Sequence, residues 1–135
     1  MKIAYCCADL GIPIRGFKGA SVHVRELASA LASLGHEVRI FSPNPGEGNS
    51  LPSGVSLVAV AVRRSPQALR QFMAKGLWKR TRQLDKDVSE LAYNFTLYRR
   101  LRELLRPWKP DIIYERYSRF NLAGLALARR LGIPH

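Results

Sequence analysis

Residues 16–38 read GFKGASVHVRELASALASLGHEV, in which a glycine-rich turn is followed at once by a helical pattern. The apolar residues of this stretch recur at the i, i+3, i+4, i+7 spacing of one helix face. They are Val24, Leu27, Ala28, Leu31 and Leu34. Gly35 stands where helices commonly end in the left-handed conformation. The stretch therefore predicts a loop, an amphipathic helix that starts at Ser21, and a turn.

Strand-like runs lie on both sides of this helix. Residues 2–7, KIAYCC, precede the loop, and Glu37–Ser42 follows the helix. Two further apolar runs occur at residues 55–62 and at Ile112–Glu115. Because strand and helix patterns alternate, we expect an α/β fold: a Rossmann-like parallel sheet with right-handed crossovers and helices on both faces. The strand at 2–7 should be central, between the strands at Glu37–Ser42 and Ile112–Glu115.

Three more helices are expected after residue 62. Pro66 opens a short helix that breaks near Gly76, and residues 121–131 form a helix closed by Gly132. Between them, residues 79–106 carry a long helical pattern that Pro107 and Pro110 end. Its expected apolar face consists of Leu84, Val88, Leu91, Phe95, Tyr98 and Leu105.

The length of 135 residues corresponds to one domain, residues 1–135. No apolar run approaches the roughly 20 residues of a membrane-spanning helix, and the amino terminus does not read as a signal peptide, so we expect a cytoplasmic protein. Cys6 and Cys7 are neighbours in a strand-like run, which predicts reduced, at least half-buried side chains on opposite faces and no metal site. The chain ends where a further strand would begin. We therefore expect a fragment of a longer domain; a small domain with a loose tail is the alternative.

The net charge of +12 is concentrated in the middle of the chain, where residues 63–109 carry nine of the excess positive charges. Three interpretations stay open: a solvated helix face, a peripheral contact with an anionic membrane on its inner face, or a nucleic-acid contact. The membrane interpretation rests on basic residues interleaved with aromatic and apolar ones. The residues concerned are Arg70, Lys75, Trp78, Lys79, Arg80 and Arg82. No recognised nucleic-acid module is present, so we do not expect nucleic acid as a partner.

The glycine turn itself is a candidate anion site, because the first N–H groups of a helix are unpaired and lie at its positive end. Gly19 would let a phosphate approach the backbone, Lys18 would add a charge, and Ser21 would cap the helix or donate its hydroxyl. His23 lies off the apolar face and could point towards a ligand. The alternative is a loop that only makes a turn.

Glu115 and Arg116 form a second candidate site. They stand at the carboxyl end of a predicted parallel strand, where ligands of such sheets bind. The charged pair could orient sugar hydroxyls or hold a phosphate. The alternative is an ordinary surface ion pair.

Two stretches of the sequence resemble the amino-terminal half of GT-B glycosyltransferases of the retaining family 4. They are MKIAYCCADLGIPIRGFKGASVHVRELASALASLGHEVRIFSP and KPDIIYERYSRFNLAGLALARRLGIPH. The resemblance implies two Rossmann-like domains facing a cleft, with the nucleotide-sugar donor held mainly by the carboxy-terminal one. Gly19 matches the second glycine of the family's usual pair, and Lys18 replaces the first. Where many relatives carry histidines after the strand, this chain has Glu115 to Ser118. The histidine often assigned a catalytic role lies on a following strand.

We therefore expect the acceptor-side domain of a hexosyltransferase-type enzyme that moves a sugar from a nucleotide-sugar to an acceptor with retention. Its partners would be the two substrates and its own carboxy-terminal domain, and it would need neither a metal nor another cofactor. The catalytic residues stay unassigned, and the fragment alone should be inactive. The alternative function is a free-standing Rossmann-like module that binds an anionic ligand or a membrane surface without catalysis.

Overall fold

The computed structural model describes residues 1–62, 82–118 and 121–135. Its elements in chain order are β1 (Lys2–Cys6), α1 (Gly19–Ser33), β2 (Glu37–Ser42), β3 (Val55–Ala59), α3 (Arg82–Trp108), β4 (Ile112–Glu115) and α4 (Ala123–Leu131). The strands form one parallel sheet in the order β3-β2-β1-β4, which confirms the predicted fold class and the central position of β1. The short helix expected after Pro66 lies outside the described residues, as does the basic segment from Arg70 to Arg80.

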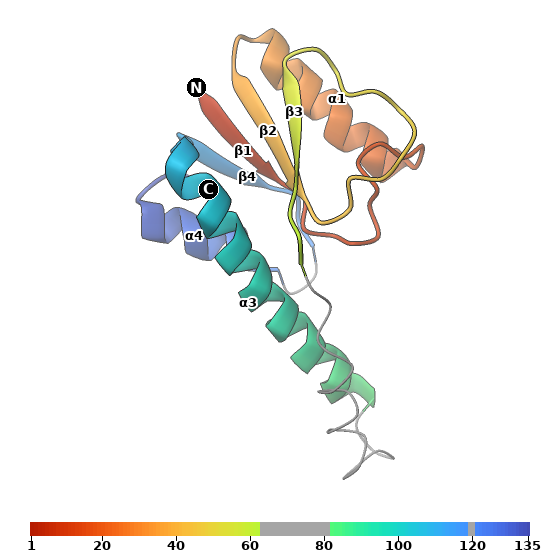
Figure 1. The fold of residues 1–135 in the computed structure, drawn as a ribbon, viewed down its shortest axis with the longest axis vertical. Coiled ribbons are helices and arrows are strands. Elements are labelled where there is room, and N and C mark those ends of the chain that lie inside the picture. The colour runs from red at the N-terminus through yellow and green to blue at the C-terminus, as the bar shows by residue number, and fades with distance from the viewer. Residues whose placement is uncertain (63–81, 119–120) are drawn as a thin grey trace.

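Strand β1 is central because its side chains are apolar on both faces. Ile3, Tyr5 and Cys7 contact α1, whereas Ala4 and Cys6 belong to the core under α3 and α4. Parallel strands covered on both faces read as continuous apolar runs. Figure 1 shows the resulting three layers, with α1 on one face of the sheet and α3 and α4 on the other.

The adjacent cysteines follow this alternation, as predicted. Cys6 and Cys7 are both free and buried, and they lie in the two separate cores. Burial raises the pKa of the Cys7 thiol to about 11, since desolvation disfavours the thiolate. Two strand ends were predicted too late: β1 ends at Cys6 rather than at residue 7, and β3 ends at Ala59 rather than at residue 62.

Helix α1 starts at Gly19, two residues earlier than predicted, with Lys18 as its N-cap. Its buried face is formed by Ser21, Val24, Arg25 and Ala28. Leu34 was wrongly assigned to this face; it is the C-cap and is 72% exposed, because the helix has already ended at Ser33. Gly35 has a φ of 82°, the left-handed conformation predicted for it.

The predicted face of α3 is confirmed only in part: Leu105 is buried and Tyr98 packs against the same core, and the side chains of Leu84, Val88 and Leu91 lie outside the described part. Leu97, Leu101, Leu105 and Trp108 are buried at spacings of four, four and three, whereas Phe95 is 64% exposed. Pro107 does not end the helix, because a proline in the last turn removes only one hydrogen bond near a terminus that is already incomplete. The helix ends at Trp108, and Lys109 follows with a φ of 53°.

Helix α4 starts at Ala123, two residues after the predicted start. It ends as predicted at Gly132, which has a left-handed φ of 68°. The backbone then returns to the sheet, and the Ile113 N–H of β4 donates to the Pro134 carbonyl over 3.1 Å.

A buried arginine fixes the loop between β1 and α1. Arg25 is only 7% exposed, and its Nη1 donates to the carbonyl oxygens of Ile14 at 2.6 Å and Gly16 at 2.7 Å. The guanidinium therefore ties the loop to the second turn of α1. Hydrogen bonds made by a charged donor are about twice as strong as neutral ones.

The loop after β2 also holds the loop between β1 and α1, through backbone hydrogen bonds. The N–H groups of Ile14 and Arg15 donate to the carbonyls of Asn44 and Pro45 at 3.1 and 3.0 Å. Gly46 has a φ of 67°, and a Cβ there would lie 2.6 Å from the Cβ of Pro13. A glycine at position 46 is thus required both by the backbone conformation and by the close approach of the two loops.

Trp108 anchors the end of α3 to the sheet. Its indole Nε1 donates to Glu37 Oε1 at 2.9 Å, and the guanidinium of Arg39 lies 4.5 Å from the ring centre. Arg39 also forms an ion pair with Glu37 at 2.7 Å. The hydrogen bonds from Trp108 and Arg39 lower the pKa of Glu37 below its ordinary value of 4.5.

The lowered pKa of Glu37 predicts a pH-dependent contribution to stability. A folded-state pKa below the unfolded one stabilises the fold above the unfolded value, and this stabilisation is lost as the pH falls through the folded value. Glu37→Gln should therefore lower the melting temperature at about pH 7 but not at about pH 2. The matched control is Glu103→Gln, which removes an exposed ion pair with Arg100 and should change little at either pH. Equal effects of Glu37→Gln at both pH values would refute the assignment.

The role of Arg25 is tested with Arg25→Met, which keeps the length and packing of the side chain. Losing both charge-assisted hydrogen bonds should cost about 3 kcal/mol of unfolding free energy in urea titrations. Amide exchange at Gly16 and the residues around it should accelerate more than exchange in β1. If stability and loop exchange stay as in the wild type, Arg25 does not hold the loop.

Candidate functional site

The carboxyl ends of β1 and β4 meet at a topological switch point. From β1 the chain crosses to β2 on one side, while β4 pairs with the other side of β1. In open parallel sheets, the crevice at such a point is where ligands bind. Three features face this edge: the loop before α1, the N-terminus of α1, and residues 115–118 after β4 (Figure 1).

The N-terminus of α1 has no side-chain cap. Lys18 is the N-cap and makes no side-chain hydrogen bond, and no acidic residue lies in the first turn. The N–H groups of Ser21 and Val22 donate to the Lys18 carbonyl. Those of Gly19 and Ala20 have no partner among the described residues. Two N–H donors at the positive end of the helix are therefore available to an anion.

Ser21 is not the cap of this helix, because it is the third residue of α1. Its side chain is completely buried, and its hydroxyl has no hydrogen-bond partner within the described part of the chain. Gly16 lies beside it: a Cβ on Gly16 would be 3.3 Å from Ser21 Oγ. The loop thus packs directly against the first turn of α1.

Gly19 occupies open space. A Cβ at this position would meet nothing within 4 Å, and its φ lies outside the left-handed range. Neither packing nor backbone strain in the described structure therefore requires a glycine there. His23 is exposed on the same helix, one turn further along.

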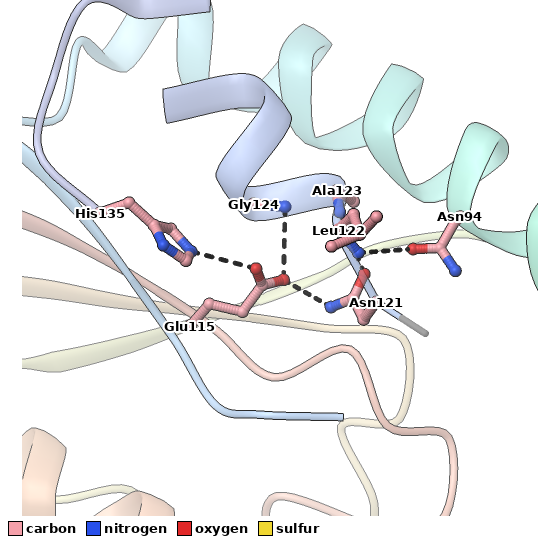
Figure 2. Close-up of polar contacts among 7 residues, drawn as sticks. All are labelled: Asn94, Glu115, Asn121, Leu122, Ala123, Gly124 and His135. Carbon is pink, nitrogen blue, oxygen red and sulfur yellow. Dashed lines mark hydrogen bonds and ion pairs between the residues drawn. The ribbon is translucent and has the colours of Figure 1, made fainter. Parts of the chain in front are cut away.

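The N-terminus of α4 is arranged in the opposite way, with three of its N–H groups occupied by side chains. Asn94 Oδ1 accepts from Leu122 at 3.1 Å, Asn121 Oδ1 from Ala123 at 3.2 Å, and Glu115 Oε1 from Gly124 at 3.3 Å. Figure 2 shows these contacts around the start of the helix. This helix terminus is satisfied inside the chain.

The Glu115 carboxylate is part of the hydrogen-bond network at the start of α4. Its side chain is 6% exposed and also accepts from Asn121 Nδ2 at 2.5 Å and pairs with His135 Nε2 at 3.1 Å (Figure 2). A Cβ on Gly124 would lie 2.5 Å from Glu115 Oε2, so a larger residue there would have to displace the carboxylate. The carboxylate orients α4 on the sheet.

Arg116 does not pair with Glu115, because neighbouring strand residues point to opposite faces. Its backbone N–H donates to the Cys6 carbonyl at 2.9 Å. Its Nε is buried and has no partner within the described residues. The structure therefore separates the two members of the predicted pair: Glu115 faces α4, and Arg116 follows the face that carries α1.

The sequence pattern did not identify Arg25, Asn94 or Asn121. The signal for Arg25 was its position four residues after Ser21 and one after Val24, on the buried side of the helix. The two asparagines act across long separations in the chain, which no local spacing reveals.

The described residues bring no three His, Cys, Asp or Glu side chains together as metal ligands. Among residues 1–62, 82–118 and 121–135, no helix is both long and apolar enough to cross a membrane. Of the predicted membrane-contact residues, only Arg82 falls within the described chain, as the first residue of α3.

Two solved structures have a similar fold. The glycosyltransferase of kitacinnamycin matches with a TM-score of 0.62 and 20% identity over 98% of this chain and 28% of its own. CalG4, the calicheamicin glycosyltransferase, matches with a TM-score of 0.64 and 17% identity over 98% of this chain and 30% of its own. The chain thus spans less than a third of each structure. No curated protein sequence matches it significantly. The model of the glycosyl transferase 4-like domain matches residues 18–135, and the chain belongs to this family.

Proposed function

We propose that this chain is the acceptor-side domain of an enzyme that transfers a sugar, of hexosyltransferase type, from a nucleotide-sugar to an acceptor with retention. The observation that carries the proposal is the uncapped N-terminus of α1 at the switch point of a glycosyl transferase 4-like domain. The same chain caps α4 with three side chains. An open helix terminus at the ligand edge is therefore a specific feature of α1.

The chemistry of sugar transfer needs stabilisation of the leaving nucleoside diphosphate. The N–H groups of Gly19 and Ala20 lie at the positive end of the α1 dipole, and the ammonium group of Lys18 adds a full charge. Fixed donors of this kind stabilise charge that develops in the transition state without having to reorganise. We assign this terminus to the diphosphate of the donor, facing it across the cleft from a second domain.

Gly19 supports the same assignment. Since nothing in the described chain limits a side chain there, the space beside Gly19 is available to a bound phosphate. A Cβ would hold that phosphate away from the backbone N–H groups. Ser21 would contribute its hydroxyl, which lacks a partner among the described residues, and the exposed His23, one turn further along α1, would contact a larger ligand.

The remaining predicted assignments extend this proposal. Arg116 belongs to the acceptor side, and Glu115 positions α4 and thereby the rim of the crevice. The partners are the nucleotide-sugar, the acceptor and the protein's own carboxy-terminal domain, with no cofactor. A cytoplasmic enzyme bound peripherally to an anionic membrane through its basic segment, including Arg82, remains a prediction.

The proposal is tested on the complete protein encoded by the gene. With a panel of nucleotide-sugars, it should release a nucleoside diphosphate and form a product with the anomeric configuration of the donor, as read by NMR. The 135-residue chain alone should release none. Turnover by this chain alone, or a complete protein that binds anions but transfers no sugar, would refute the proposal and favour a non-catalytic binding module.

A second prediction concerns the uncapped terminus. Lys18→Asp should stabilise the fold by about 1 kcal/mol, because aspartate is a good N-cap and accepts from the first-turn N–H groups. The same change should weaken pyrophosphate binding by at least about tenfold, since it removes a cation and occupies a donor. Urea unfolding and calorimetric titration measure the two effects.

The matched control is Lys109→Asp, at an exposed position with left-handed backbone where aspartate is tolerated. It makes the same change in net charge beyond the end of α3 and should alter pyrophosphate affinity by less than about twofold. If Lys18→Asp stabilises the fold and leaves pyrophosphate affinity unchanged, the anion does not bind at α1.

A further inference from the structure

Arg116 is a cation without a counter-charge in the described structure. The residue follows β4 directly and is only partly exposed, and its backbone is fixed to Cys6 of β1. The side chain makes no hydrogen bond or ion pair with any described residue, and Nε is buried. Buried polar atoms normally have a hydrogen-bond partner, and Nε has none among the described residues.

Tyr5 lies on the same side of the sheet. The register pairs Tyr5 with Tyr114, and Arg116 follows Tyr114 by two residues, so all three point to the α1 face. Tyr5 is fully buried, its ring packs edge-on against that of Tyr114, and its hydroxyl has no partner among the described residues. Burial raises the pKa of Tyr5, and the positive charge of Arg116 partly opposes this effect. The two polar groups without partners therefore lie on the same face of the sheet, at its carboxyl edge.

The carboxylates nearest in the chain do not neutralise Arg116. Glu115 points to the other face and is held by Asn121, Gly124 and His135. Asp9 accepts from the Gly11 N–H at 2.7 Å. Residues 63–81 and 119–120 contain no acidic residue. No carboxylate of the described residues forms an ion pair with Arg116.

We propose that Arg116, assisted by Tyr5, forms the acceptor subsite and that the acceptor carries a phosphate group. The guanidinium offers a planar set of donors that matches two phosphate oxygens, and the tyrosine hydroxyl is an additional donor beside it. This inference rests on the proposed function, because a sugar transferase needs an acceptor at the crevice in addition to the donor diphosphate at α1. It names the acceptor class: a phosphate ester, free or as the headgroup of a lipid.

The test titrates the 135-residue chain with glycerol 3-phosphate at about 0.15 M salt. Arg116→Gln should weaken binding by at least about tenfold, Arg116→Lys by less, and Tyr5→Phe by a few-fold. The matched control is Arg130→Gln, an exposed arginine in the last turn of α4, which should change affinity by less than about twofold. Thermal unfolding of Arg116→Gln should occur at or above the wild-type temperature, because an unpaired cation has been removed.

A second arm identifies the source of the phosphate. Phosphatidylcholine vesicles with and without phosphatidic acid are sedimented with wild type and Arg116→Gln. A loss restricted to phosphatidic acid vesicles indicates a lipid acceptor, and a loss seen only with glycerol 3-phosphate indicates a soluble one.

Three results overturn the inference. The first is a wild type that binds neither probe, and the second is binding that Arg116→Gln leaves intact. The third is a marked drop in the unfolding temperature of Arg116→Gln, which would make the residue structural. Glycerol 3-phosphate binding that Lys18→Asp abolishes and Arg116→Gln does not would assign the anion to α1, so the proposed function would survive and only the acceptor subsite would fall.

Discussion

The burial of β1 on both faces is the constraint from which the rest of the structure follows. Because Ile3, Tyr5 and Cys7 need cover on one side and Ala4 and Cys6 on the other, helices must lie on both faces. The chain meets this need by crossing from β1 towards β2 and later returning to β4 on the opposite edge. The carboxyl end of β1 is thereby the point where the two crossovers diverge, which is where open parallel sheets bind their ligands.

The two helices that start at this edge differ in whether side chains satisfy the N–H groups of their N-termini. At α4, three side chains satisfy three N–H groups, and the polar contacts fix the helix on the sheet. At α1, a lysine stands at the N-cap, where its side chain makes no capping hydrogen bond, and the helix lacks the stabilisation of a good cap. Giving up local stability in this way is typical of functional sites. The buried Arg25 keeps the loop before α1 in place without occupying its N–H groups.

The alternation of patterns was sufficient to predict the parallel sheet, the central position of β1 between β2 and β4, and the opposite faces of Cys6 and Cys7, because these follow from periodicity and crossover rules. Periodicity did not predict burial correctly where a helical pattern continues beyond the element that it packs against. Leu34 and Phe95 continue apolar patterns, yet both are exposed, since burial depends on what lies opposite and not on spacing. Pro107 was misread because a proline near a helix end costs little.

The site was predictable only in part. The glycine turn and the residues after β4 were placed at the correct edge by the rule for parallel sheets. The interaction partners of Glu115 and Arg116 were not predicted. The Glu115 carboxylate is bound by Asn121, Gly124 and His135, and Arg116 points away from it. Contacts of this kind come from the packing of α4 against β4, which the order of residues does not specify.

The most direct measurement is a titration of the isotope-labelled chain with UDP and GDP, followed through its backbone amide resonances. If the open terminus of α1 binds the donor diphosphate, the amides of Gly19 and Ala20 should shift most. Those of Leu122, Ala123 and Gly124 should stay in place, because side chains already occupy them. Shifts concentrated at α4, or none at α1 with either nucleotide, would contradict the assignment of this domain to a sugar transferase that holds its donor phosphate at α1.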